Sequence, residues 1–186
     1  MVFLLITKVI AAVILLICLG FLGYWFIAWK QGNCDFRVLR GKKSDFSVDG
    51  MDTKKVTLSC TVPIKNVGRQ NGTIMDAFVR HYMPEEQYDK VAVRTLLMDT
   101  ARPRTDDYWE ALIVLPKEAV ELKVLVELTS RSGNLLRDLE DFPDMPLDII
   151  YQTVGRSDWT YEKGRIALTR EELRNALYEK VNGGRA

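Results

Sequence analysis

The sequence has few of the residue types from which catalytic and metal sites are usually built. It has one histidine, His81, and three cysteines among 186 residues. A zinc site takes its ligands mainly from cysteine and histidine, so without a second histidine or a Cys-x-x-Cys pair it would depend almost wholly on carboxylates. No serine lies in a Gly-x-Ser-x-Gly elbow. We therefore predict no cofactor, no metal site and no enzymatic activity.

Charge is nearly absent from the N-terminal segment. No acidic residue precedes Asp35, and the 21 residues from position 9 to 29 carry no charge at all. At the rise of an α-helix this stretch is about 30 Å long, which matches the hydrocarbon thickness of a bilayer. The sequence predicts a single transmembrane helix over residues 9–30, preceded by a short N-terminal tail over residues 1–8.

Three kinds of processed leader share some of these features. A secretory signal has a shorter apolar stretch and two small residues at its cleavage site, whereas Phe26 occupies one of those positions. A lipoprotein signal needs a small residue before its cysteine, and Ile17 precedes Cys18. A type IV pilin leader needs an early acidic residue. The segment is therefore predicted to be an uncleaved tether, and Cys18 an ordinary residue of the apolar helix.

Aromatic residues gather at the distal end of the predicted span. Tyr24, Trp25 and Trp29 are followed by Lys30. Tryptophan and tyrosine rings prefer the headgroup layer, and a lysine can extend its amine outward from the helix end. We predict that these four residues anchor the helix at the membrane interface.

Two arguments about the membrane side of the remaining chain disagree. Within about 20 positions of the helix end, basic residues are more numerous on the distal side, which favours the cytoplasm. These residues are Lys30, Arg37, Arg40, Lys42 and Lys43. Tethered sandwich domains, in contrast, are mostly extracytoplasmic. On that analogy we place the domain outside, and the cytoplasm is the alternative.

The charges of the remaining chain are balanced. Residues 31–186 hold 24 basic and 25 acidic residues. A nucleic-acid-binding domain usually has an excess of positive charge concentrated on one face, so nucleic acid is not a predicted partner. At this length the segment suffices for one domain with a proper core. The predicted hinge between helix and domain is residues 31–33.

Short strands dominate that domain. Residues 56–64 alternate apolar and hydroxyl side chains, as in a half-buried strand. Seven or eight strands are predicted in all, and their spacing favours one β-sandwich over residues 31–168. The stronger strands are at 56–64, 73–81, 91–98, 108–115, 122–129, 147–154 and 161–168, and weaker ones are near 36–39 and 46–48.

Helical spacing appears twice after the strands begin. Residues 134–142 place leucines at helical intervals, which predicts a short helix or a crossover loop. Thr169 and Glu172 form a capping box at the start of a C-terminal amphipathic helix over residues 169–182. Its apolar stripe either packs on the sandwich or docks a partner. The stripe consists of Leu173, Ala176, Leu177 and Val181.

One acidic and aromatic cluster is a candidate ligand surface. It consists of Asp106, Asp107, Tyr108, Trp109 and Glu110. Carboxylates beside aromatic rings occur in sugar-cleaving sites, although they more commonly form a solvated loop. Cys34 and Cys60 could pair if the domain is outside the cytoplasm, and we expect both to be unpaired thiols.

The segment 61–68 followed by 71–76 resembles the strand–turn–strand of cell-surface immunoglobulin-like modules. The resemblance implies an immunoglobulin-like sandwich, although the Cys–Trp–Cys pattern of antibody domains is absent and we assign no family. Two functions follow from the sequence. The first is a single-pass, membrane-anchored, non-enzymatic interaction or assembly module that binds a protein partner or forms a homo-oligomer. The alternative is a membrane-tethered carbohydrate-active hydrolase or carbohydrate-binding domain that uses the 106–110 cluster.

Overall fold

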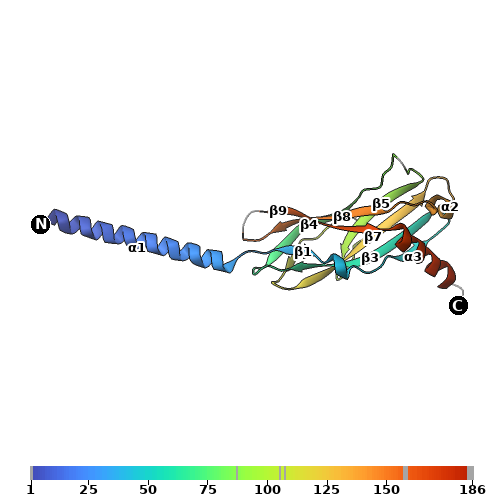
Figure 1. Ribbon diagram of the computed structural model, residues 1–186. Helices are drawn as coiled ribbons and strands as arrows, with labels where there is room; N and C mark the ends of the chain where they lie inside the picture. The colour runs from blue at the N-terminus through green and yellow to red at the C-terminus, as the bar shows by residue number, and fades with distance from the viewer. Residues whose placement is uncertain (1, 87, 105, 107, 157–158, 184–186) are drawn as a thin grey trace.

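The computed structural model describes residues 2–86, 88–104, 106, 108–156 and 159–183. It consists of a long N-terminal helix, α1 (Val2–Gln31), and a mostly-β domain beyond it (Figure 1). The helix is long and apolar enough to cross a membrane, and none of its described side chains is buried. It begins at Val2, so the described part of the predicted tail is helical and continuous with the predicted span.

The domain has two antiparallel sheets. Sheet A has the strand order β1-β3-β7-β5, and β2 pairs with β3 beside β1. Sheet B has the order β6-β4-β8-β9. The strands of sheet A are β1 (Phe36–Val38), β2 (Ser47–Met51), β3 (Lys55–Asn66), β5 (Val91–Asp99) and β7 (Ala119–Ser130); those of sheet B are β4 (Gly72–His81), β6 (Leu112–Val114), β8 (Met145–Val154) and β9 (Thr160–Leu168).

The centre of sheet A is formed by the two longest strands. Alternate residues of β3 face alternate residues of β7, as in the pairs Val56–Leu128 and Leu58–Val126. All four of these side chains are fully buried. Burying one such side chain stabilises a fold by roughly 1.5–3 kcal/mol, so this pairing fixes the register of the sheet. Sheet B covers the same core with residues such as Ile149.

Pro63 lies inside the central strand β3, where a missing backbone N–H would normally be costly. Its carbonyl accepts a hydrogen bond from the Leu39 amide, so the Pro63 nitrogen also faces the β1–β2 side of β3. On that side β1 ends at Val38, and the chain turns through a 3-10 helix, η1 (Arg40–Lys42), before β2 begins. The proline thus falls where no neighbouring strand needs its donor.

The predicted strands are confirmed, with one change of length. The described residues form nine strands where seven or eight were predicted. The segment predicted as a strand over 108–115 pairs only at Leu112–Val114. Trp109, which precedes it, is buried and donates its ring N–H to the Ile74 carbonyl, 3.2 Å away. Because the Trp109 ring turns into the core, the backbone around it does not pair as a strand, and β6 begins only at Leu112.

Both predicted helices of the domain are present. The first, α2 (Leu135–Leu139), is capped by Asn134, whose side chain accepts a hydrogen bond from the Arg137 amide. The second, α3 (Arg170–Gly183), begins with the predicted capping box. The Thr169 hydroxyl accepts from the Glu172 amide, and the Glu172 carboxylate accepts from the Thr169 amide, at 3.1 and 3.3 Å. Both helices lie at the end of the domain opposite α1 (Figure 1).

Candidate functional site

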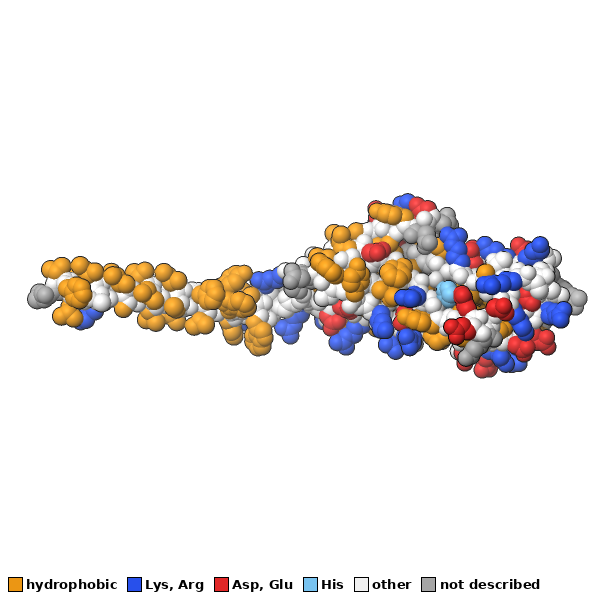
Figure 2. All heavy atoms as spheres, turned by 90° about the horizontal axis from the view of Figure 1, so that it is seen from above, with side chains coloured by type: hydrophobic (Ala, Val, Ile, Leu, Met, Phe, Trp, Pro, Cys, Tyr) orange, Lys and Arg blue, Asp and Glu red, His pale blue; other side chains and the backbone are white. Residues whose placement is uncertain are grey.

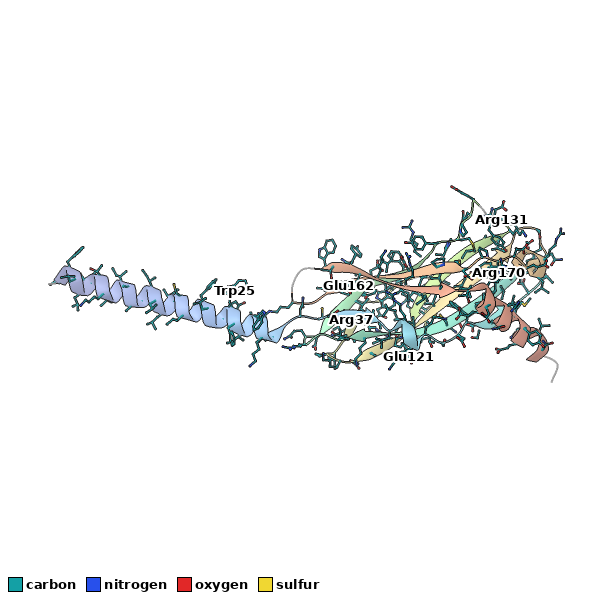
Figure 3. All side chains as sticks on the ribbon, in the orientation of Figure 1. Trp25, Arg37, Glu121, Arg131, Glu162 and Arg170 are labelled. Atoms are coloured by element: carbon teal, nitrogen blue, oxygen red, sulfur yellow. The ribbon has the colours of Figure 1, made fainter. Side chains whose placement is uncertain are left out.

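The predicted interface anchors lie on the last two turns of α1. Tyr24, Trp25 and Trp29 are exposed, and Trp25 projects from the helix just before it meets the domain (Figure 3). Phe21 packs edge-on against Trp25, with 6.2 Å between the ring centroids. The rings therefore lie on one side of the helix end, where Tyr24, Trp25 and Trp29 line a hollow with Arg156 of the domain. Their role at a membrane interface, with Lys30, stays a prediction.

Hydrogen bonds tie the end of α1 to two loops of the domain. Arg156, which follows β8, donates to the Gln31 side chain at 2.6 Å and to the Ala28 carbonyl at 3.5 Å. Arg69, in the β3–β4 loop, donates to the Lys30 carbonyl at 3.3 Å. We call this contact between α1 and the two loops the junction. Gly32 ends the helix with a positive φ of 68°, the usual conformation of a C-terminal cap.

The predicted hinge is held between glycines. A Cβ added to Gly155 would come within 2.4 Å of the Asn33 side-chain oxygen and 2.5 Å of the Cys34 sulfur. A Cβ on Gly68 would meet the Asn33 carbonyl oxygen at 2.4 Å. The segment after α1 therefore lies directly on the backbone of two loops. Residues 31–33 are packed and hydrogen-bonded, contrary to the open hinge that their composition suggested.

Asn66 is a buried polar residue that lies next to the junction. It is fully buried, and its side-chain nitrogen donates to the carbonyls of Gln70 and Val114, at 2.8 and 3.1 Å. Its side-chain oxygen accepts from the amides of Gly68 and Asp35, at 3.0 and 3.3 Å. One amide side chain thereby joins the segment after α1, the β3–β4 loop and β6. In the sequence, Asn66 is recognisable only as a turn residue.

The structure brings Tyr108, Trp109 and Glu110 of the acidic and aromatic cluster to one small hollow, beside Arg102 and Arg104. Asp106 accepts two hydrogen bonds from the Arg104 guanidinium, at 2.6 and 3.1 Å, and these hold the pKa of the Asp106 carboxyl down, at about 2. Glu110 pairs with Arg102 at 3.4 Å. Tyr108 is exposed, and Asp107 lies outside the described residues.

The described carboxylates of the cluster, both paired with arginines, lack the electrostatics of a glycosidase acid. A glycosidase general acid needs a raised pKa, and the arginine bonds move that of Asp106 the other way. The cavity beside Trp109 and Glu110 has a volume of only about 10 Å³. Among the described residues, no group of three or more His, Cys, Asp or Glu side chains is placed to hold a metal.

The two thiols of the domain are free in the structure. Cys60 is 2% exposed, and burial raises the pKa of its thiol to about 12. Cys34 is half-buried at the junction, and burial raises its pKa as well. Raised thiol pKa values lower the reactive thiolate fraction, so neither cysteine has the character of a nucleophile.

The outer face of sheet B divides into an apolar half and a charged half. The half nearer α1 exposes a group of apolar side chains that we call the sheet B patch (Figure 2). Phe78 lies beside Ile150 in the register of β4 and β8, and Trp159 packs edge-on against Tyr161. The patch consists of Met75, Phe78, Ile113, Trp159 and Tyr161.

The charged half lies farther from α1 on the same strands. Arg80, Asp148 and Arg165 are register partners across β4, β8 and β9. Asp148 is fully buried and accepts two hydrogen bonds from Arg165, at 2.7 and 3.0 Å. These bonds, with a smaller contribution from the Tyr82 hydroxyl, lower the pKa of Asp148 to about 2. Lys163 also pairs with Asp148, at 3.6 Å, so the carboxylate of this half is satisfied and positive charge is in excess, whereas the side chains of the sheet B patch are exposed.

No family model matches this chain, and no curated protein matches it. Among solved structures, it is similar to the putative ApaA protein from Bordetella pertussis, with 14% identity over 73% of this chain and 94% of that chain and a TM-score of 0.41. It is also similar to the GAE domain of yeast GGA1, with 12% identity, coverage of 72% and 98%, and a TM-score of 0.35. Because these TM-scores are below 0.5, we draw no conclusion about function from them.

Proposed function

We propose that this chain is a single-pass membrane protein whose β-domain is a non-enzymatic module that binds a protein held at the same membrane. The proposal starts from α1, a 30-residue apolar helix without one buried residue. A helix that is hydrophobic all round needs an apolar environment, which a bilayer supplies. The lipid bilayer is therefore its first partner.

The sheet B patch carries the proposal for a protein partner. Its members are between 45% and 67% exposed, and they come from β4, β6, β9 and the loop before β9. Exposed Asp76 and Lys163 lie among them, and exposed apolar side chains grouped on one face of a domain are typical of a contact site. The patch lies on the half of the domain nearer α1 (Figure 2). A second protein anchored in the same bilayer could therefore contact it at the same short distance from the membrane surface. A second copy of this chain satisfies the same condition.

Two finer features of the domain belong to the same proposal. We propose an immunoglobulin-like sandwich, on the support of two antiparallel sheets around one core. We propose that the domain is extracytoplasmic. The test uses Arg131→Cys, which places a thiol at an exposed position, in a Cys34→Ser background. Cys60 can stay, because it is buried and reacts poorly with a labelling reagent. An impermeant thiol reagent should label Arg131→Cys in intact cells, or in spheroplasts if an outer membrane is present. Labelling only after lysis would place the domain in the cytoplasm.

Double substitution of the patch tests the protein contact. Phe78→Glu with Ile113→Glu adds two charges to the apolar face while leaving the core untouched. The matched control, Ala92→Glu with Ala119→Glu, adds the same charge at exposed positions of sheet A. After purification in mild detergent, the wild type and the control should carry a partner, or a second copy, near 1:1. The patch variant should lose it. Equal recovery with all three chains, or no partner with any, would contradict the proposal.

A further inference from the structure

An open groove runs between α2 and α3. It has a volume of about 660 Å³ and lies at the end of the domain farthest from α1 (Figure 1). The two helices are separated in sequence by all of β8 and β9. The groove therefore exists only in the folded domain. It is separate from the sheet B patch, since the two share no residue.

One side of α3 holds the helix in place. Leu173 and Ala176 are buried in the core, 2% and 4% exposed. Glu172 forms an ion pair with Lys43, at 2.6 Å between the Lys43 nitrogen and the carboxylate. Arg170 donates to the Phe142 carbonyl at 2.8 Å and so links α3 to the chain that follows α2. The helix that forms one wall of the groove is thus held by its own buried residues, by an ion pair outside the groove and by Arg170, which also lines the groove.

The other side of α3 and the outer side of α2 supply apolar walls. Leu139 and Leu173 form a buried floor. Above it, Leu136 is 55% exposed, Tyr178 70% and Val181 53%. Three large apolar side chains at the rim of one groove keep substantial surface in water. Covering that surface would be favourable by about 25 cal/mol per Å² of apolar area.

Positive charge is in excess around the groove. Arg137, Arg170 and Arg174 line it, with Glu140 as the acidic exception. Within the described residues, neither Arg137 nor Arg174 forms an ion pair, and the Arg170 guanidinium donates to the carbonyls of Phe142 and Asp141. The acidic residues of α3 lie on its other side, where Glu171 and Glu179 line a separate hollow with Asp45. The helix is thereby divided into a basic, apolar side and an acidic side.

We propose that the α2–α3 groove binds an acidic segment of a partner protein that inserts apolar side chains between the two helices. Arginines beside an apolar floor complement carboxylates that flank leucine- or phenylalanine-like side chains. The same arginines would repel a basic segment. The distance from α1 places the groove in the aqueous phase, a step that rests on the proposed membrane anchoring. The bilayer that holds α1 is therefore not the occupant.

Fluorescence anisotropy with designed peptides tests this inference on the full chain in detergent. The acidic probe is a labelled 15-residue peptide with leucine and phenylalanine at helical spacing and glutamates elsewhere. A second probe replaces the glutamates with lysines, and a third replaces the apolar residues with serines. We expect the wild type to bind the acidic apolar probe at least tenfold more tightly than either of the others.

Charge reversal in the groove supplies the decisive comparison. Arg137→Glu with Arg174→Glu should weaken the acidic probe at least tenfold and should tighten binding of the lysine probe. The matched control, Arg40→Glu with Lys42→Glu on η1, makes the same change in net charge at exposed positions outside the groove and should bind as the wild type does. Unchanged affinity in the groove variant, equal binding of all probes, or no binding would overturn the inference.

Two further measurements distinguish the groove from the sheet B patch and from a self-association surface. The sheet B variant, Phe78→Glu with Ile113→Glu, should bind the acidic probe normally, because its substitutions lie outside the groove. If the sheet B patch proves not to bind a partner, the peptide result for the groove is unaffected. If the groove proves not to bind the peptide, the test of the sheet B patch is likewise unaffected. Analytical ultracentrifugation measures the oligomeric state of the wild type and of the groove variant. If the wild type self-associates and charge reversal in the groove disperses it, the occupant is a second copy and the inference is wrong.

Discussion

The first and last helices of this chain have opposite relations to their surroundings. Helix α1 is apolar on every side and has no buried residue, whereas α3 is buried along one side and charged on the others. Both satisfy their backbone internally, so secondary structure does not distinguish them. The difference lies in how apolar side chains are distributed around the axis. The distribution on α1 suits the proposed bilayer span, and that on α3 lets the helix pack one side on the domain.

The largest effect should come from breaking the apolar character of α1. Leu16→Arg with Leu19→Arg places two charges near the middle of the helix, at a cost of about 3 kcal/mol each for a bilayer span. We expect the chain to move from the membrane fraction to the soluble or degraded fraction. Tyr178→Arg on α3 is the control, since its side chain is exposed, and it should fractionate as the wild type does. Retention of the double variant in membranes would contradict a bilayer span.

The stability of the domain next to the junction should depend strongly on Asn66. Asn66→Ala leaves two amides and two carbonyls without this partner, and we expect a loss of about 4 kcal/mol in the free energy of unfolding. Chemical denaturation of the full chain in detergent measures it. Asn71→Ala, at an exposed position of the same turn region, should cost less than 0.5 kcal/mol, roughly the usual limit for a surface site. Similar losses for both would mean that the hydrogen bonds of Asn66 do not stabilise the domain.

The two sides of α3 should differ in their effect on stability. Leu173→Ala removes a buried side chain and should cost about 3 kcal/mol, as other leucine truncations in cores do. Val181→Ala, at the rim of the groove, should change the free energy of unfolding by less than about 0.5 kcal/mol. The same denaturation measurement applies to both variants. A large cost at Val181 would mean that the rim of the groove supports the fold.

The smallest effect concerns the charged half of sheet B. The folded pKa of Asp148, about 2, lies below the ordinary value of 3.8 that an unfolded chain would show. The ionised carboxylate therefore stabilises the fold fully above about pH 4, and that contribution declines as the pH falls toward 2. Denaturation at pH 7, 4 and 2.5 should show a steeper loss for the wild type than for Arg165→Gln, which lacks the bonding partner. Parallel losses would assign the acid sensitivity to other groups.

The sequence predicts the parts of the fold that depend on local patterns. Alternation in β3 and the capping box at Thr169 and Glu172 are confirmed because each is complete within a few residues. The prediction of Trp109 as a strand residue is wrong, since nothing local shows that its ring bonds to the Ile74 carbonyl, 35 positions away. The α2–α3 groove is hidden in the sequence for the same reason. Only folding brings Leu136 beside Tyr178.

The contact between Arg156 and the last turn of α1 gives the anchor an orientation as well as a position. Because Arg156 of the domain is hydrogen-bonded to Ala28 and Gln31 of α1, the domain turns with the helix. The direction in which the sheet B patch faces therefore depends on the rotation of α1 about its own axis. One residue inserted into α1 would turn the whole domain by about 100° around that axis. If α1 spans a bilayer as proposed, a partner that holds the domain in one orientation would also fix which side of α1 faces neighbouring membrane helices.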